Sequence, residues 1–101
     1  MYGGAVKLYH TTDAAEAILI LDGDAPFHDD RYRLGGLTLV GVIVSDRPLD
    51  ANEGRPGEDV FEVTISDDLD LDEYEIVEEG KPYREWIVPA KVLNQFPRRL
   101  L

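Results

Sequence analysis

Apolar and polar residues alternate along several short segments of this chain, as they do in strands that bury one side. The clearest alternation covers residues 60–65, where Phe61, Val63 and Ile65 share one side. Residues 37–45 form a longer apolar run, which predicts a central strand. The segments that we predict to be strands are 6–10, 37–45, 60–65, 74–77 and 84–88, with 69–71 as a turn or a short edge strand.

A helix is predicted directly after the first of these strands, over residues 14–21. Thr11, Thr12 or Asp13 can cap it, because short oxygen side chains accept hydrogen bonds from the free amides of a first helical turn. The capping-box spacing to Glu16 fits Asp13 as the cap. The residues that we predict to form the buried stripe of this helix are Ala15, Ile18, Leu19 and Leu21.

Polar segments rich in turn-forming residues separate the predicted elements. Residues 24–36 and 50–58 are predicted to be loops, and loops of this length in small domains often carry function. Pro89 ends the last strand, and a short helix or helical turn is expected at 90–96. One or two helices beside five or six strands predict an α+β fold with a twisted, largely antiparallel sheet.

The length of 101 residues and the apolar fraction of 44% predict a single domain over residues 1–101. No apolar run approaches the roughly 20 residues of a membrane span, and the first residues lack the pattern of a signal peptide. The chain contains no cysteine, which excludes disulfides and thiolate metal sites. We therefore expect a cytoplasmic protein without a membrane segment.

The formal net charge is −11, from 21 acidic and 10 basic residues. A field of this sign opposes contact with a nucleic-acid backbone, so nucleic acid is not an expected partner. Residues 67–79 carry eight acids and no base, which usually means a solvated surface. A calcium loop is the alternative, and it fails because the required glycine and glutamate are missing at their spacing. The two histidines and the scattered acids show no metal-ligand spacing either.

Glu85 is the first candidate for chemistry, because bulky apolar residues surround it on its predicted strand. A carboxylate in such surroundings is costly to bury unless its charge is used. Two interpretations are open. In one, Glu85 faces water on an edge strand. In the other, it stands in a cleft, where it holds a ribose hydroxyl or stabilises a cationic, sugar-like transition state.

His10 is the second candidate, because it ends the first strand immediately before Thr11 and Thr12. A histidine in this place is either a hydrogen-bonded structural residue or a ligand contact beside the amides that open the next helix. Ser45 ends the central strand, but it lacks the glycine-flanked turn of a serine hydrolase. His28 lies in the first polar loop, where we expect it to be exposed.

Three segments, in this order along the chain, resemble the ADP-ribosyltransferase superfamily, which includes the poly(ADP-ribose) polymerases. Residues 8–12 (Leu-Tyr-His-Thr-Thr), followed by a helix, are similar to the first family strand, whose histidine engages NAD. Residues 41–45 (Gly-Val-Ile-Val-Ser) are similar to the second motif. Residues 84–89 (Arg-Glu-Trp-Ile-Val-Pro) are similar to the late strand that carries the family glutamate. The likeness spans residues 8–93 and implies a single ADP-ribosyltransferase-like domain with a split sheet.

The resemblance implies that NAD is the substrate and that its nicotinamide–ribose bond is cleaved through an oxocarbenium-like transition state. Glu85 is then the catalytic residue, because it binds the nicotinamide ribose and stabilises the cation. His10 would hydrogen-bond a ribose hydroxyl or orient the nicotinamide half of NAD, and Thr11 would present its backbone to the carboxamide. Thr12 and Ser45 complete the implied NAD-binding set.

Two positions differ from the family pattern. Ile43 stands where an aromatic residue often stacks on nicotinamide, and Thr11 replaces a glycine. These differences favour an alternative, in which the chain is a non-catalytic nucleotide-binding or protein-interaction module on the same fold. Enzymatic ADP-ribosyl transfer and a protein acceptor or partner therefore both stay open. An RNA 2′-phosphotransferase is a related third option, which the net charge and the lack of a basic domain disfavour.

Overall fold

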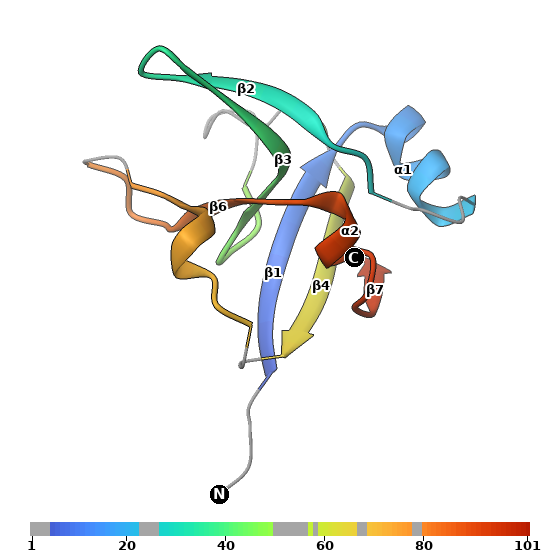
Figure 1. Ribbon diagram of the computed structural model, residues 1–101. Coiled ribbons are helices and arrows are strands. Elements are labelled where there is room, and N and C mark those ends of the chain that lie inside the picture. Colours follow the sequence, from blue (N-terminus) through green and yellow to red (C-terminus); the bar gives the residue numbers. More distant parts are fainter. Residues whose placement is uncertain (1–4, 23–26, 50–56, 58, 67–68, 78–79) are drawn as a thin grey trace, which may run out of the picture.

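The computed structural model describes residues 5–22, 27–49, 57, 59–66, 69–77 and 80–101, which form seven strands and two α-helices (Figure 1). The strands are β1 (Ala5–Thr12), β2 (Asp30–Leu34), β3 (Leu37–Ser45), β4 (Asp59–Ser66), β5 (Glu75–Ile76), β6 (Glu85–Val88) and β7 (Arg98–Leu100). The helices are α1 (Ala14–Asp22) and α2 (Ala90–Leu93), and a 3₁₀ turn, η2 (Asp72–Tyr74), precedes β5. No helix in these described ranges is long and apolar enough to cross a membrane.

The strands form an open sheet in the order β5-β6-β3-β1-β4-β7, and β2 pairs with the first part of β3. Each of these pairings is antiparallel. The expected α+β class with a largely antiparallel sheet is therefore confirmed. The order also brings β1, β3 and β6 side by side, although long stretches of sequence separate them.

β1 is bound very differently to its two neighbours in the sheet. It pairs with β4 along its whole length, whereas the recorded pairing with β3 is the single position Tyr9↔Ser45. Next to this position the imidazole of His10 reaches across, and its Nδ1 lies 2.9 Å from the carbonyl oxygen of Ile43. At the junction between β1 and β3, the contact from the His10 side chain therefore stands in place of backbone hydrogen bonds.

The hydrophobic core lies on one face of the sheet and includes residues of both helices. Its buried members are Leu8, Ala17, Ile20, Phe27, Val42, Val44, Phe61, Val63, Ile65, Trp86, Val88, Ala90 and Leu93. Ile43 and Ile87, which face each other across β3 and β6, point to the opposite face because side chains alternate along a strand. They are buried as well, together with Leu49. β6 and the second half of β3 are thus covered on both faces.

The predicted strands are confirmed with small shifts of their bounds. β3 has the predicted bounds, and β4 extends the predicted segment by one residue at each end. Phe61, Val63 and Ile65 are buried on one side of β4, as the alternation predicts. Most of the loop predicted at 50–58 lies outside the described residues.

Helix α1 buries a different side from the predicted one. Asp13 caps it as expected, because its Oδ1 accepts a hydrogen bond from the backbone N–H of Glu16 at 2.8 Å. Ala17 and Ile20 are buried. The predicted stripe is wrong, since its residues are exposed: Ala15, Ile18, Leu19 and Leu21. Nearly every residue of this helix is apolar, so periodicity does not fix its rotation, whereas the hydrogen bond between Glu16 and His10 does.

Part of the predicted loop at 24–36 is strand β2. A turn at Gly35 and Gly36, whose φ angles are +58° and +85°, joins it to β3. Charged residues flank Tyr32 in this strand, so no apolar pattern predicts it. Just before β2, Phe27 enters the core and is 2% exposed. Strand β7 was also not predicted, because its three residues are too few to show a period.

Candidate functional site

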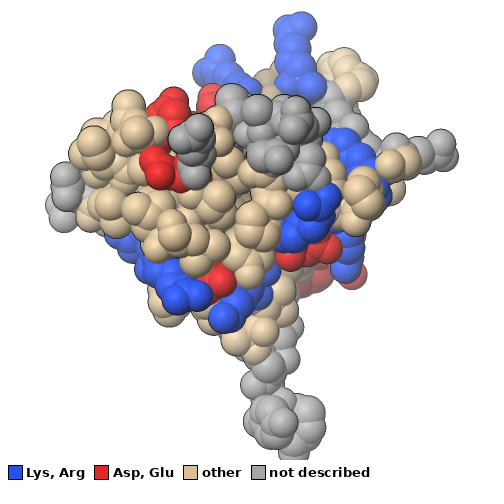
Figure 2. Space-filling view, turned by 180° about the vertical axis from the view of Figure 1, so that it is seen from behind, with Lys and Arg blue, Asp and Glu red and all other residues tan. Residues whose placement is uncertain are grey.

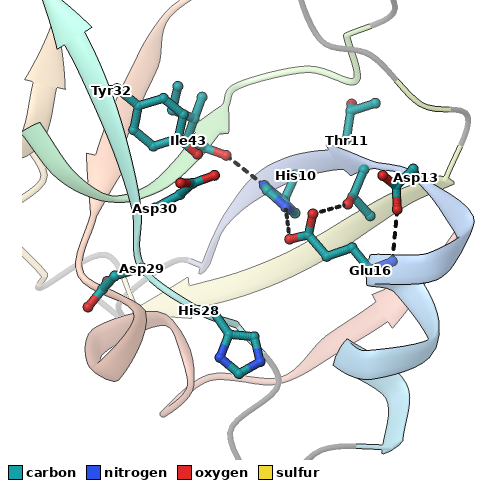
Figure 3. A pocket seen from close by; sticks show the side chains of 10 residues that line it. His10, Thr11, Asp13, Glu16, His28, Asp29, Asp30, Tyr32 and Ile43 are labelled. Atoms are coloured by element: carbon teal, nitrogen blue, oxygen red, sulfur yellow. Dashed lines mark hydrogen bonds and ion pairs between the residues drawn. The ribbon is translucent and has the colours of Figure 1, made fainter.

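A cavity of about 360 Å³ opens where β1 ends and α1 begins (Figure 3). Its wall combines the end of β1, the first turn of α1, β2 with the segment that leads into it, and β3. The lining residues are His10, Thr11, Thr12, Asp13, Glu16, His28, Asp29, Asp30, Tyr32 and Ile43. We name it the His10 cavity. It brings together His10, Thr11 and Thr12, three of the residues that the family resemblance implies.

His10 is held from both sides of its ring. Nδ1 lies 2.9 Å from the carbonyl oxygen of Ile43, and Nε2 lies 3.3 Å from Oε1 of Glu16. The ring also packs edge-on against Phe27, with the centroids 5.7 Å apart. A carbonyl and an ionised carboxylate are both acceptors, so each ring nitrogen of His10 faces an acceptor. Of the two interpretations of His10, the structure shows the hydrogen-bonded one, at the wall of a cavity.

Glu16 is the partner of His10, and sequence reasoning assigned it only to the helix cap. Its place at the third position of α1 turns its side chain back toward β1. One carboxylate oxygen faces His10, and the other accepts a hydrogen bond from the hydroxyl of Thr12. These bonds, that of His10 above all, lower the pKa of Glu16 to about 2, although partial burial opposes the shift. The carboxylate is therefore ionised throughout the physiological range.

Three further carboxylates line the His10 cavity, and each is engaged by a backbone amide at 2.8 Å. Asp13 accepts from the N–H of Glu16, Asp29 from that of Ala90, and Asp30 from that of Arg31. Among the residues that the structure describes, no lysine or arginine lines the cavity. The resulting field favours cations and hydroxyl donors over anionic groups. His28, which is exposed as expected, also belongs to this wall.

The two threonines of the cavity have separate tasks. The hydroxyl of Thr11 donates to the carbonyl oxygen of Leu49 at 2.7 Å, which ties the segment after β3 to the end of β1. The hydroxyl of Thr12 donates to Glu16. Both are strand residues and not helix caps.

Glu85 is buried, with an exposed fraction of 2%. It lies on β6, which has β3 on one side and β5 on the other, so the interpretation as a water-facing edge residue is wrong. Its Oε1 lies 2.9 Å from Nζ of Lys81, whose side chain is 29% exposed. Glu85 does not line the His10 cavity.

Ser45 lies on β3, between Tyr9 on β1 and Glu85 on β6. It pairs with Tyr9 on one side and with Glu85 on the other, so these three residues share one face of the sheet. His10 follows Tyr9 and points to the opposite face. The hydroxyl of Ser45 donates to the carbonyl oxygen of Arg47 at 2.6 Å. The structure therefore places Ser45 and Glu85 next to the junction between β1 and β3, while His10, Thr11 and Thr12 line the cavity.

A second buried carboxylate, Glu62 on β4, has a purely structural explanation. Arg99 lies 2.9 Å from it, Lys7 lies 3.6 Å from it, and the hydroxyl of Tyr9 donates to it. The hydrogen bond from Arg99 is the main reason that the pKa of Glu62 is lowered. Seen from behind, basic side chains stand beside acidic ones (Figure 2). Local ion pairs of this kind offset part of the negative charge of the chain.

Within the described ranges, no group of three or more histidine and acidic side chains is arranged to hold a metal ion. Comparison of the chain with known protein families, with curated proteins and with solved structures gave no match. The family resemblance therefore stays a prediction, and function has to be argued from the geometry of the site.

Proposed function

We propose that the chain is an NAD-dependent ADP-ribosyltransferase or NAD glycohydrolase with an ADP-ribosyltransferase-like fold. One observation carries this proposal. The three segments of the resemblance, which are far apart in sequence, lie on the neighbouring strands β1, β3 and β6. Tyr9, Ser45 and Glu85 stand opposite one another across these strands. The His10 cavity opens beside this row, where β1 and β3 cease to pair.

The charge of the His10 cavity supports NAD in a particular orientation. Of the described residues, four carboxylates and neither a lysine nor an arginine line the cavity. The oxidised nicotinamide ring is cationic, and its ribose carries hydroxyl donors, so this half of the molecule suits the cavity. The diphosphate is anionic and is expected to stay outside. Tyr32, which also lines the cavity, offers an aromatic face in place of the one that Ile43 lacks.

In the proposed reaction the bond between ribose and the nicotinamide nitrogen breaks, and its electron pair leaves with nicotinamide. Water or an acceptor nucleophile attacks the ribosyl cation and then loses a proton. Ile43 lines the cavity and shares a face of the sheet with Ser45 and Glu85. In this proposal the ligand extends across Ile43 and has to reach the carboxylate of Glu85, which is 2% exposed and paired with Lys81. A fixed anion there stabilises the cationic transition state more than it stabilises the substrate.

The test is the release of nicotinamide from NAD by the purified chain. Glu85→Gln keeps the shape of the side chain and removes its charge, and we expect the rate to fall about 100-fold or more. Glu75→Gln is the matched control, because Glu75 is an ion-paired acid on the adjacent strand β5, outside the cavity. The control should retain the wild-type rate. Equal rates for wild type and Glu85→Gln, or no release by the wild type, would contradict catalysis.

A non-catalytic nucleotide-binding module is the second candidate, and the surroundings of Glu85 favour it. The carboxylate is 2% exposed, is paired with Lys81 and does not line the cavity. Calorimetry with NAD, ADP-ribose and nicotinamide separates the two candidates. Binding of NAD without release of nicotinamide would support this module, and the absence of binding would leave only a protein-interaction role.

A further inference from the structure

A hydrogen-bond donor and an acceptor stand side by side on the wall of the His10 cavity (Figure 3). The donor is Nε2 of His10, and the acceptor is Oε1 of Glu16, 3.3 Å away. This separation is long for a charge-assisted bond, which is commonly about 2.8 Å. The side chain of Glu16 is 43% exposed, whereas that of His10 is 10% exposed. The contact between His10 and Glu16 is therefore a weak hydrogen bond, and Glu16 is the more exposed of the two side chains.

The carboxylate of Glu16 can accept more hydrogen bonds than it receives from His10 and Thr12. An ionised carboxylate offers about four lone-pair positions. It is fixed in place by Thr12 and by the cap of α1, so a ligand that binds to it need not order it first. The other three carboxylates of the cavity are each bound to a backbone amide, and none of those contacts involves a side-chain donor.

We propose that Glu16 accepts a hydrogen bond from the ribose hydroxyl for which the resemblance implies His10, and that the hydroxyl oxygen enters between Nε2 of His10 and Oε1 of Glu16 in place of their direct contact. A hydroxyl is both donor and acceptor, so it complements this pair. A phosphate or carboxylate would face Glu16 with like charge, and a carboxamide N–H could use the acceptor but not the donor. The inference rests on the proposed function and adds a residue that makes the site specific for ribose over deoxyribose.

The experiment compares the affinities of nicotinamide riboside and of its 2′-deoxy and 3′-deoxy analogues by calorimetry. These probes keep the cationic ring and lack phosphate. We expect the wild type to bind the riboside about tenfold more tightly than one of the deoxy analogues, because a hydrogen bond to a charged group is lost. In Glu16→Gln the ratio of the two affinities should fall to a value between about one and about three. Asp30→Asn removes the same charge from the same cavity, while its native carboxylate contacts the backbone of Arg31, and it should keep the wild-type ratio.

The outcomes separate this inference from the proposed function. A wild type that binds all three probes equally, or a Glu16→Gln variant that keeps the full ratio, would overturn the role of Glu16 and leave NAD binding intact. A wild type that binds neither NAD nor any of the three probes would overturn both. A ratio that falls to the same extent in Asp30→Asn would show a general effect of charge, and it would also contradict the inference.

Discussion

At the scale of single residues, the best-determined group of the site is His10 with Glu16. Both ring nitrogens of His10 face acceptors, and Glu16 is held by a side chain from β1 on each oxygen. The hydrogen bond with His10, helped by that from Thr12, explains why the pKa of Glu16 lies near 2 and not at its usual 4.5. This pair connects the stability of the β1–α1 junction to the chemistry of the cavity.

The lowered pKa of Glu16 predicts a dependence of stability on pH. A carboxylate with a lower pKa in the folded state contributes fully to the free energy of unfolding above pH 4.5, and this contribution is lost as the pH falls to about 2. Urea unfolding of wild type and Glu16→Gln between pH 6 and about 2.5 measures it. The wild type should be the more stable protein at pH 6, and the difference should shrink toward pH 2.5. Solvent screening of the half-exposed side chain keeps the effect modest.

Other acids with lowered pKa values, such as Glu62 and Glu75, also lose stabilisation in acid. Both the wild type and Glu16→Gln contain these acids, so their contributions cancel when the stabilities of the two proteins are compared. A difference between wild type and Glu16→Gln that stays constant over the whole pH range would show that Glu16 is not ionised against His10. In His10→Gln, the carboxyl signal of Glu16 in ¹³C NMR should titrate nearer to pH 4.5, because the largest cause of the shift is removed.

At the scale of elements, the rotation of α1 is the most instructive difference between sequence and structure. The helix has apolar residues on all sides, and a polar contact selects the side that packs. We expect Leu19→Lys to change the free energy of unfolding by no more than about 0.5 kcal/mol, because Leu19 is 59% exposed. Ile20→Ala should cost about 2–4 kcal/mol, because Ile20 is fully buried. Chemical denaturation measures both changes in the free energy of unfolding. A Leu19→Lys variant as unstable as Ile20→Ala would show that Leu19 is buried, as the sequence pattern predicts.

Strand prediction succeeded where alternation or a continuous apolar run marks the buried residues, and it failed where charged residues or a short length hide the pattern. The alternation in β4 and the apolar run of β3 could be read directly from the sequence. β2 could not, because its residues are mostly charged and its pairing depends on the turn at Gly35 and Gly36. The burial of Phe27 could not be read either, because it comes from tertiary packing outside any regular element.

At the scale of the whole molecule, the sequence offers candidate site residues but does not predict how the sheet arranges them. Order along the chain does not predict that β3 lies between β1 and β6, because strand order depends on long-range pairing. It also does not predict which residues share a face, since a shift of one residue in register reverses every side chain. The resemblance implies that His10 and Glu85 contact the same NAD molecule. The structure places them on opposite faces of the sheet, on β1 and β6, with β3 between these strands.

The charge of the whole chain leads to a final prediction, about salt. The net charge of −11 and the acidic lining of the His10 cavity repel the diphosphate of NAD and attract cationic nicotinamide riboside. Salt screens both effects, since the Debye length falls from about 14 Å at 50 mM to about 4 Å at 500 mM. Over this range the Kd of NAD should fall severalfold, and the Kd of nicotinamide riboside should rise. Calorimetry measures both, with uncharged nicotinamide as the control that changes least. If salt weakened NAD binding as strongly as riboside binding, a basic surface would have to hold the diphosphate. The proposed orientation, in which the diphosphate lies outside the cavity without a basic surface to hold it, would then be wrong.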